Sequence, residues 1–190
     1  MLLGCSVLFP EPDVALPITD LDLEPKPGQL EPMMPDAQGP FVEIASGEVG
    51  GEEFTLTVYR SPEGFCTSLF PIQFGGGGCG PAPGDGLPEF ARFGTIGQGG
   101  LSDGTIEVDG MVDPGVAKVW VVTDGGQRAN AVLVPAQLDG LEASVFFVFL
   151  PEGTHPQTIV AANESGDVLD EFPLLPIAPG GPGAPPTPGD

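Results

Sequence analysis

Positive charge is scarce in this sequence. Only five Lys and Arg oppose 27 Asp and Glu, which gives a formal net charge of −22 over 190 residues. A surface this negative repels phosphate backbones and anionic lipid headgroups. We therefore expect no nucleic-acid partner and no membrane attachment through a basic patch. The acidity is expected to serve solubility, while cationic partners and weakly held divalent metal stay open.

Side chains for catalysis and motifs for cofactors are also few. The single histidine, His155, lies in the polar turn "PEGTHP", where it is a poor base for a Ser–His–Asp or Cys–His nucleophile. One Trp and one Tyr offer little lining for a sugar site, and Trp120 in "AKVWVVT" is expected on a sheet face. The runs "GGGG" and "GQGG" lack the context of a phosphate loop. We therefore predict a protein that is not an enzyme and binds no cofactor.

Two hypotheses about carboxylates stay open. Any two of the 27 acids could converge for glycoside hydrolysis, so a carboxylate-based envelope hydrolase, or an accessory subunit of a secreted enzyme, is the alternative function. Two acids meeting in a cleft would favour it. Oxygen-rich loop edges of β-sandwiches also bind Ca²⁺. The segment "SDGTIEVDGMVDPG" supplies weak calcium candidates without EF-hand spacing, namely Asp103, Glu107, Asp109 and Asp113.

Long hydrophobic runs are missing as well. The longest, "ASVFFVFL", has the length of a strand rather than of a membrane span. Instead, 30 Gly and 24 Pro give more than twice the average share of these residues. Prolines and acids recur through residues 6–40, which predicts an extended acidic tether, and residues 173–190 predict a disordered Pro/Gly-rich tail.

Between these tails, residues 41–172 have the pattern of a single domain made of strands. "EFTLTVYR" alternates with Phe54, Leu56 and Val58 on one face, and in "SVFFVFL" the face is Val145, Phe147 and Phe149. "GTIEVDGMV" is expected to turn Ile106, Val108 and Met111 inward. Turn residues separate such segments every 8–15 residues or so, and no helical stripe occurs. The fold class predicted is all-β, a single antiparallel β-sandwich of immunoglobulin-like type.

Three cysteines leave one without a partner if two pair. Cys66 lies in a strand candidate and Cys79 in the loop "FGGGGCGPAPGDG". A disulfide between them would close a glycine-rich loop that loses much freedom on ordering. Two free thiols in a reducing compartment are the alternative. A zinc site is disfavoured because the second pair of ligands is missing.

The remaining cysteine, Cys5, follows Leu2, Leu3 and Gly4, and this "LLGC" resembles the lipobox of bacterial lipoproteins. The resemblance implies that residues 1–5 are the remnant of a signal and that Cys5 carries acyl chains, which anchor a protein stably when several are present. A lipobox is normally preceded by a charged region and an apolar region, and here only Met1 precedes the motif. We therefore expect either that the coding sequence begins upstream or that the sequence is clipped, and a chance "LLGC" at an ordinary N-terminus is the alternative.

Two longer blocks resemble uncharacterised exported β-sandwich proteins of high-GC Gram-positive and related bacteria. They are "EFTLTVYRSPEGFCTSLF…GGGGCG" and "GMVDPGVAKVWVVTDGG…SVFFVFLPEGTHPQTIVAANESGDVL". The resemblance implies the fold and an extracytoplasmic location, but no activity. The function predicted is a non-catalytic binding or structural module anchored at the cell envelope, or secreted. Its partner would be a protein or an envelope polymer, bound by loops 71–88 and 124–128.

Overall fold

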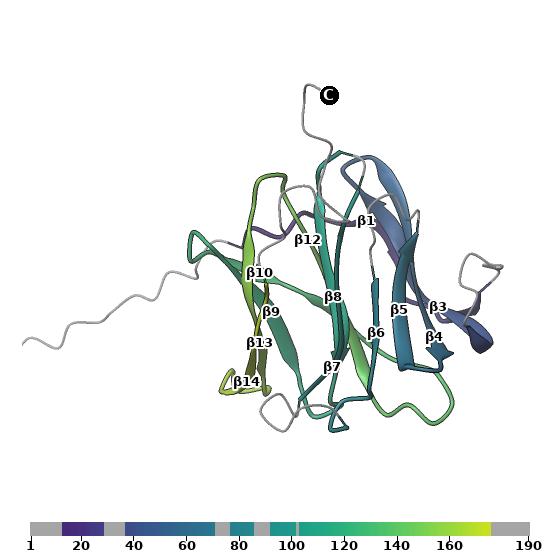
Figure 1. The fold of residues 1–190 in the computed structure, drawn as a ribbon. Helices are drawn as coiled ribbons and strands as arrows, with labels where there is room; N and C mark the ends of the chain where they lie inside the picture. Colours follow the sequence, from purple (N-terminus) through teal and green to yellow (C-terminus); the bar gives the residue numbers. More distant parts are fainter. Residues whose placement is uncertain (1–12, 29–36, 71–76, 86–91, 102, 176–190) are drawn as a thin grey trace, which may run out of the picture.

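The computed structural model describes residues 13–28, 37–70, 77–85, 92–101 and 103–175. These residues form fourteen strands and no helix, and all the ladders between the strands are antiparallel. The predicted all-β antiparallel architecture is therefore confirmed. Figure 1 shows the sheets close to edge-on, stacked as layers.

The strands group into three sheets, which we name for what they carry. The disulfide sheet has the order β1-β3-β4-β5-β6, with β2 paired to β3; its strands are β1 (Thr19–Asp22), β2 (Lys26–Pro27), β3 (Gln38–Val49), β4 (Glu52–Ser61), β5 (Gly64–Phe70) and β6 (Gly77–Gly80). The central sheet has the order β11-β12-β8-β7, with β7 (Phe93–Gly100), β8 (Ile106–Val112), β11 (Val132–Pro135) and β12 (Ser144–Leu150). The C-terminal sheet has the order β10-β9-β13-β14, with β9 (Lys118–Thr123), β10 (Arg128–Asn130), β13 (Pro156–Ala162) and β14 (Val168–Pro173).

The central sheet is covered on both faces, so the layers number three rather than the two of a simple sandwich. Successive side chains of a strand point to opposite faces. On β12, Val145, Phe147 and Phe149 pack in the core shared with the disulfide sheet, as the alternation predicted. Phe146, Val148 and Leu150 pack in a second core shared with the C-terminal sheet. Burial on both faces explains the nearly continuous apolar run of this strand.

The first core is built from the alternating residues of β4 and their partners on β12. Phe54, Leu56 and Val58 are buried together as predicted. The Phe54 ring lies 5.9 Å from the ring of Phe147 and 4.8 Å from that of Phe149, both tilted. Such aromatic pairs add to the stabilisation that comes from burying their area. This core holds the disulfide sheet against the central sheet.

Residues 13–28 depart from the extended tether predicted for residues 6–40. Here β1 and β2 both pair with β3, and the amides of Val14 and Leu16 donate to the carbonyls of Arg128 and Phe149. Pro27 is tolerated because β2 is a short strand at an edge, where a missing N–H costs no ladder bond, and Pro17 and Pro25 lie outside the strands. The tether prediction is therefore wrong for this segment, whereas residues 1–12 and 29–36 lie outside the described part. The expected domain 41–172 also begins earlier, because β3 starts at Gln38.

Asp13 is the side chain that fastens this segment to the C-terminal sheet. Its carboxylate accepts hydrogen bonds from the Asn130 amide N–H at 3.0 Å and from the Asn130 side chain at 2.7 Å. Burial raises the pKa of Asp13, but these bonds, together with one from the Ala15 N–H, outweigh it and leave the pKa below its usual value. The ionised carboxylate of Asp13 is therefore the form that binds Asn130.

Replacing Asp13 by alanine should release the segment from the sheet. We expect Asp13→Ala to lower the free energy of unfolding by about 1 kcal/mol, since a hydrogen bond to a charged group stabilises by this order. Urea denaturation at neutral pH measures the loss, and Glu53→Ala, at an exposed position of β4, is the control. Because the pKa of Asp13 is lowered by folding, the difference between wild type and Asp13→Ala should shrink as the carboxylate is protonated in acid. A difference that persists unchanged in acid would contradict this role.

At the other end, β14 includes Pro173, and the Leu174 N–H donates to the carbonyl of Gln157 at 2.8 Å. The folded part thus runs slightly past the expected boundary at residue 172. The rest of the predicted tail, residues 176–190, lies outside the described part. No helix among the residues that the structure places is long and apolar enough to cross a membrane.

Candidate functional site

The four calcium candidates do not form one site. Asp103 and Asp113 lie at opposite ends of β8, where Asp103 accepts a hydrogen bond from the Thr105 N–H and Asp113 is paired with Arg92 at 3.2 Å. Glu107 and Asp109 lie between them, two positions apart on the extended strand. Among the described residues, no group of three or more His, Cys, Asp or Glu side chains is close enough together to hold a metal ion.

Glu107 and Asp109 form instead a pair of acids in the interior, which we call the acid pair. Both residues are 0 % exposed, and none of their four carboxylate oxygens has a hydrogen-bond partner in the described part of the chain. They share one face of β8 with Met111, which packs in the core under the disulfide sheet. Val108 and Met111 are both buried, as expected, but they pack in opposite cores, because odd and even positions of a strand face opposite ways.

The register of the central sheet gives the acid pair its neighbours. Glu107 lies opposite Phe149 on β12 and Gly99 on β7, and Asp109 lies opposite Phe147 and Gly97. Two aromatic residues therefore flank the pair on one side and two glycines on the other. Carboxylates in such surroundings lose their hydration without gaining ionic partners.

The surroundings shift both acids toward the protonated form. Burial, followed by the charge of Asp109, raises the pKa of Glu107 well above its usual value. Burial also raises the pKa of Asp109, to about 6, although the nearby Thr67 hydroxyl and Glu107 work in the opposite direction. Two neighbouring buried carboxyls titrate as a pair, and the first proton to be bound is held the more tightly.

Glycines make the close approach of β6 and β7 possible beside the acid pair. A Cβ on Gly97 would overlap Oδ1 of Asp109 and lie 2.6 Å from the carbonyl carbon of Gly77. A Cβ on Gly78 would lie 2.5 Å from the carbonyl oxygen of Ile96. The backbones of the disulfide sheet and the central sheet therefore touch here without intervening side chains. We call this contact, formed by Gly77, Gly78 and Gly97, the glycine seam.

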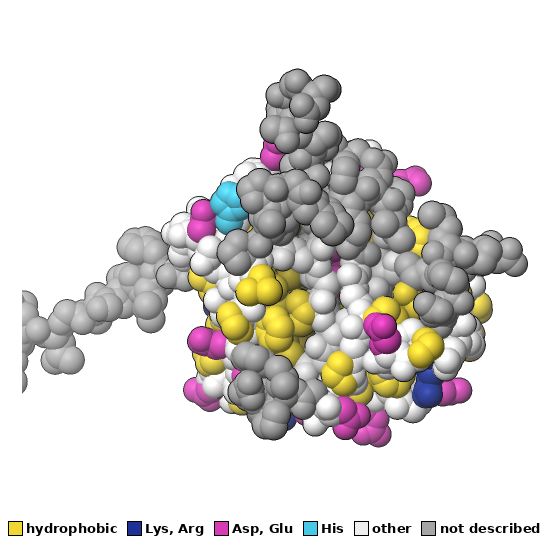
Figure 2. Space-filling model, in the orientation of Figure 1, with side chains coloured by type: hydrophobic (Ala, Val, Ile, Leu, Met, Phe, Trp, Pro, Cys, Tyr) yellow, Lys and Arg dark blue, Asp and Glu magenta, His cyan; other side chains and the backbone are white. Residues whose placement is uncertain are grey.

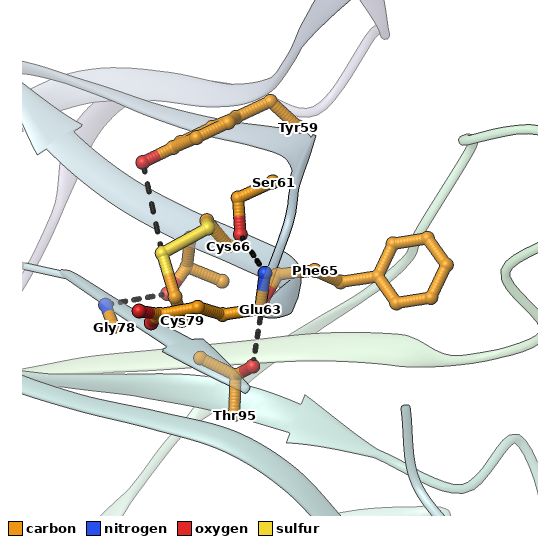
Figure 3. Close-up of a disulfide and its surroundings, with 9 residues drawn as sticks. Tyr59, Ser61, Glu63, Phe65, Cys66, Gly78, Cys79 and Thr95 are labelled. Atoms are coloured by element: carbon orange, nitrogen blue, oxygen red, sulfur yellow. Dashed lines mark hydrogen bonds between the residues drawn. A yellow bond between two sulfur atoms is a disulfide. The ribbon is translucent and has the colours of Figure 1, made fainter. Parts of the chain in front are cut away.

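The predicted disulfide is present on the outer side of this seam. Cys66 of β5 and Cys79 of β6 are bonded and lie directly opposite each other in the ladder. Cys66 is 0 % exposed whereas Cys79 is exposed, and the Tyr59 hydroxyl lies 3.9 Å from the sulfur of Cys79 (Figure 3). On the other side of β5, the Thr95 hydroxyl donates to the carbonyl of Phe65 at 2.8 Å and ties β7 to the same hairpin.

The described surface is hollowed beside Arg60. A pocket of about 320 Å³ lies between the start of β3, the end of β4 and the loop before β12; its lining residues are Gln38, Gly39, Pro40, Val42, Arg60, Gln137, Leu138 and Asp139. The Arg60 guanidinium donates to the carbonyl of Asp139 and lies 5.1 Å from the Phe65 ring centre. The volume is at the lower limit for a small-molecule site.

Trp120 and His155, which the sequence also singled out, lie on a sheet face and in a turn. Trp120 is half-buried on β9, as expected for a sheet-face residue, and Arg128 stacks over its ring at 3.9 Å. His155 lies in the turn before β13, where its carbonyl accepts from the Asp124 N–H. On the face shown in Figure 2, the acidic side chains are scattered, most of them near the edge of the view, rather than gathered in one hollow.

Cys5 and parts of loop 71–88 lie outside the described residues, so the structure places neither the proposed acylation site nor that whole loop. The acids at 107 and 109 were singled out for the wrong reason, as loop-edge ligands. The sequence does contain a signal that could have corrected this. Glu107 and Asp109 occupy alternate positions with Met111, so they share its face of the strand, and the other face of the strand is also apolar. Comparison with protein-family models, curated proteins and solved structures finds no match to this chain.

Proposed function

We propose that this chain is an exported, non-catalytic binding or structural module, held at the cell envelope by acyl chains on Cys5. The observation that supports it best is the Cys66–Cys79 disulfide. Structural disulfides form and persist in oxidising compartments and are rare in the cytosol. With Cys66 and Cys79 joined, Cys5 is the cysteine left for lipid attachment.

The acid pair bears on the alternative, a carboxylate-based hydrolase. Two acids do converge, but they converge in the interior between two sheets, and both are 0 % exposed. A general acid must come within hydrogen-bond reach of its substrate. The pair therefore does not support the hydrolase, and the binding module is favoured.

Within the proposal, the stacked antiparallel sheets serve as a scaffold that presents its loops to a protein or an envelope polymer, as the two sheets of an immunoglobulin-like sandwich do. The turn at residues 124–128, between β9 and β10, remains a candidate contact. The pocket beside Arg60 is a second one, because Arg60 forms no ion pair with a described residue and its pocket walls include Val42 and Leu138. An occupant would bring an apolar group and a hydrogen-bond acceptor.

Metabolic labelling with radioactive palmitate tests the anchor. We expect label in the protein expressed from the complete gene, including any coding sequence upstream of Met1, and none in the Cys5→Ser variant, because the thiol of Cys5 is the acyl acceptor. Cys79→Ala, labelled in parallel, is the control: it removes a cysteine of the disulfide rather than the acyl acceptor, so it should keep the label. Equal labelling of wild type and Cys5→Ser, or no labelling of either, would overturn the anchor.

A further inference from the structure

The acid pair is the feature that the proposed function leaves unexplained. Two carboxyls without hydrogen-bond partners in a closed interior are costly, because an isolated buried charge is far less stable than a solvated one. Placing a second acid two positions away adds repulsion when both are ionised. A polar but uncharged pair would fit the same space at lower cost. Close packing of the two sheets around Glu107 and Asp109 therefore depends on whether these carboxyls are protonated.

The elements around the pair supply no counter-charge. Within the described residues, β7 faces it with Gly97 and Gly99, β12 with Phe147 and Phe149, and β5 with Thr67 and Leu69. The cysteine of β5 and that of β6 are joined in the disulfide and do not titrate. Each acid has the other as its charged neighbour, so a proton is the cation that neutralises them.

The location of the pair decides what its ionisation would do. Asp109 lies against Gly97, and Gly97 lies against Gly77 of the disulfide sheet. A hydrated carboxylate needs room for water, which the glycine seam does not provide. Ionisation of both acids therefore opposes the contact between β6 and β7 first.

We propose that Glu107 and Asp109 act as an acid-dependent lock between the disulfide sheet and the central sheet. While the pair holds its protons, the two sheets pack closely across the glycine seam. As the protons leave, repulsion and the need for hydration loosen this packing. The device makes the stability of the module respond to the acidity of the medium it is exported into.

The direction of the effect follows from the pKa shifts. Both pKa values are higher in the folded chain than the ordinary 4.5 of Glu and 3.8 of Asp, so the folded state holds protons that the unfolded state has already released. The contribution of the acid pair to stability is then greatest in acid, below the unfolded pKa values, and falls as the pH rises through about 6, the folded value for Asp109. The raised pKa of Glu107 adds a contribution of the same sign.

Chemical denaturation of the full chain as a function of pH tests the lock. From about pH 5 to about pH 8, we expect the unfolding equilibrium constant of the wild type to rise at least about tenfold, since one pKa unit corresponds to a factor of ten per proton. The double variant Glu107→Gln/Asp109→Asn should lose this rise and be the more stable protein at about pH 8. Glu53→Gln, which removes one exposed charge, should keep the wild-type slope.

A measurement on the wild type alone keeps the test independent of how the variants fold. Infrared spectra in heavy water should show the carbonyl band of a protonated carboxylic acid at about pH 6, where exposed Asp and Glu are ionised. Absence of that band, or a wild-type pH slope equal to that of the double variant, would overturn the lock. The stability of the wild type should be the same with millimolar calcium as with a chelator. If calcium stabilises the wild type but not the double variant, the acid pair binds a metal ion rather than protons, and the lock is overturned.

Discussion

The variant Gly97→Ala should be severely destabilised, although it adds a single methyl group. The added Cβ would overlap Oδ1 of Asp109 and would lie 2.6 Å from the carbonyl carbon and 2.8 Å from the Cα of Gly77. Asp109 is enclosed, and Gly77 belongs to a strand that is paired to β5 and linked to it through the disulfide. Neither neighbour can retreat without separating the two sheets. We expect a loss of about 3 kcal/mol in the free energy of unfolding.

Urea denaturation of Gly97→Ala beside a matched glycine variant measures this loss. Gly125→Ala lies in the turn between β9 and β10, where the nearest atom to the new Cβ is 3.5 Å away, an ordinary contact. Its stability should stay within about 0.5 kcal/mol of the wild type, as for most surface substitutions. Equal stability of the two variants would show that the glycine seam is not closely packed.

The architecture could be predicted from the sequence where a local pattern carries the information. The alternation of Phe54, Leu56 and Val58 identified a strand and its buried face, and the glycine-rich loop beside Cys79 identified the disulfide. Both depend on residues near one another in the chain. Pairing within a hairpin and the parity of a strand are local properties, so no knowledge of the wider fold was needed.

The third layer and the acid pair depend on contacts distant in sequence. The second face of β12, with Phe146 and Val148, is as apolar as the first. The prediction used only one face of this strand, so it missed that the central sheet is covered on both sides. Glu107 and Asp109 were expected near strand ends, as calcium candidates at loop edges, and fully buried acids are rare unless they are paired. Their burial follows from where the disulfide sheet packs. Residues 13–28 were expected to be extended because proline density indicates a tether, yet the acceptors that hold them lie on β10 and β12.

Removing the disulfide should cost about as much as filling the glycine seam, but for a different reason. Cys66 and Cys79 are separated by 13 positions, and cross-linking a loop of that length stabilises the folded state by about 3 kcal/mol in the chain-entropy treatment, because the unfolded chain is restricted. The double variant Cys66→Ala/Cys79→Ala should lose that amount. It should also unfold at the same urea concentration in the presence and absence of reductant, whereas reduction should destabilise the wild type.

Two further results separate the cross-link from the packing of its cysteines. Intact mass with thiol alkylation should show Cys66 and Cys79 blocked in the exported protein and both reactive after reduction, and free thiols at both positions would contradict the oxidising compartment that the proposed function requires. Cys5→Ser should unfold with the wild-type midpoint, because that thiol takes no part in the cross-link. The deciding comparison is between the reduced wild type and Cys66→Ala/Cys79→Ala, since only the latter has lost the buried sulfur of Cys66. Equal stabilities would assign the whole loss to the cross-link, and a less stable variant would assign the excess to the cavity left in the disulfide sheet.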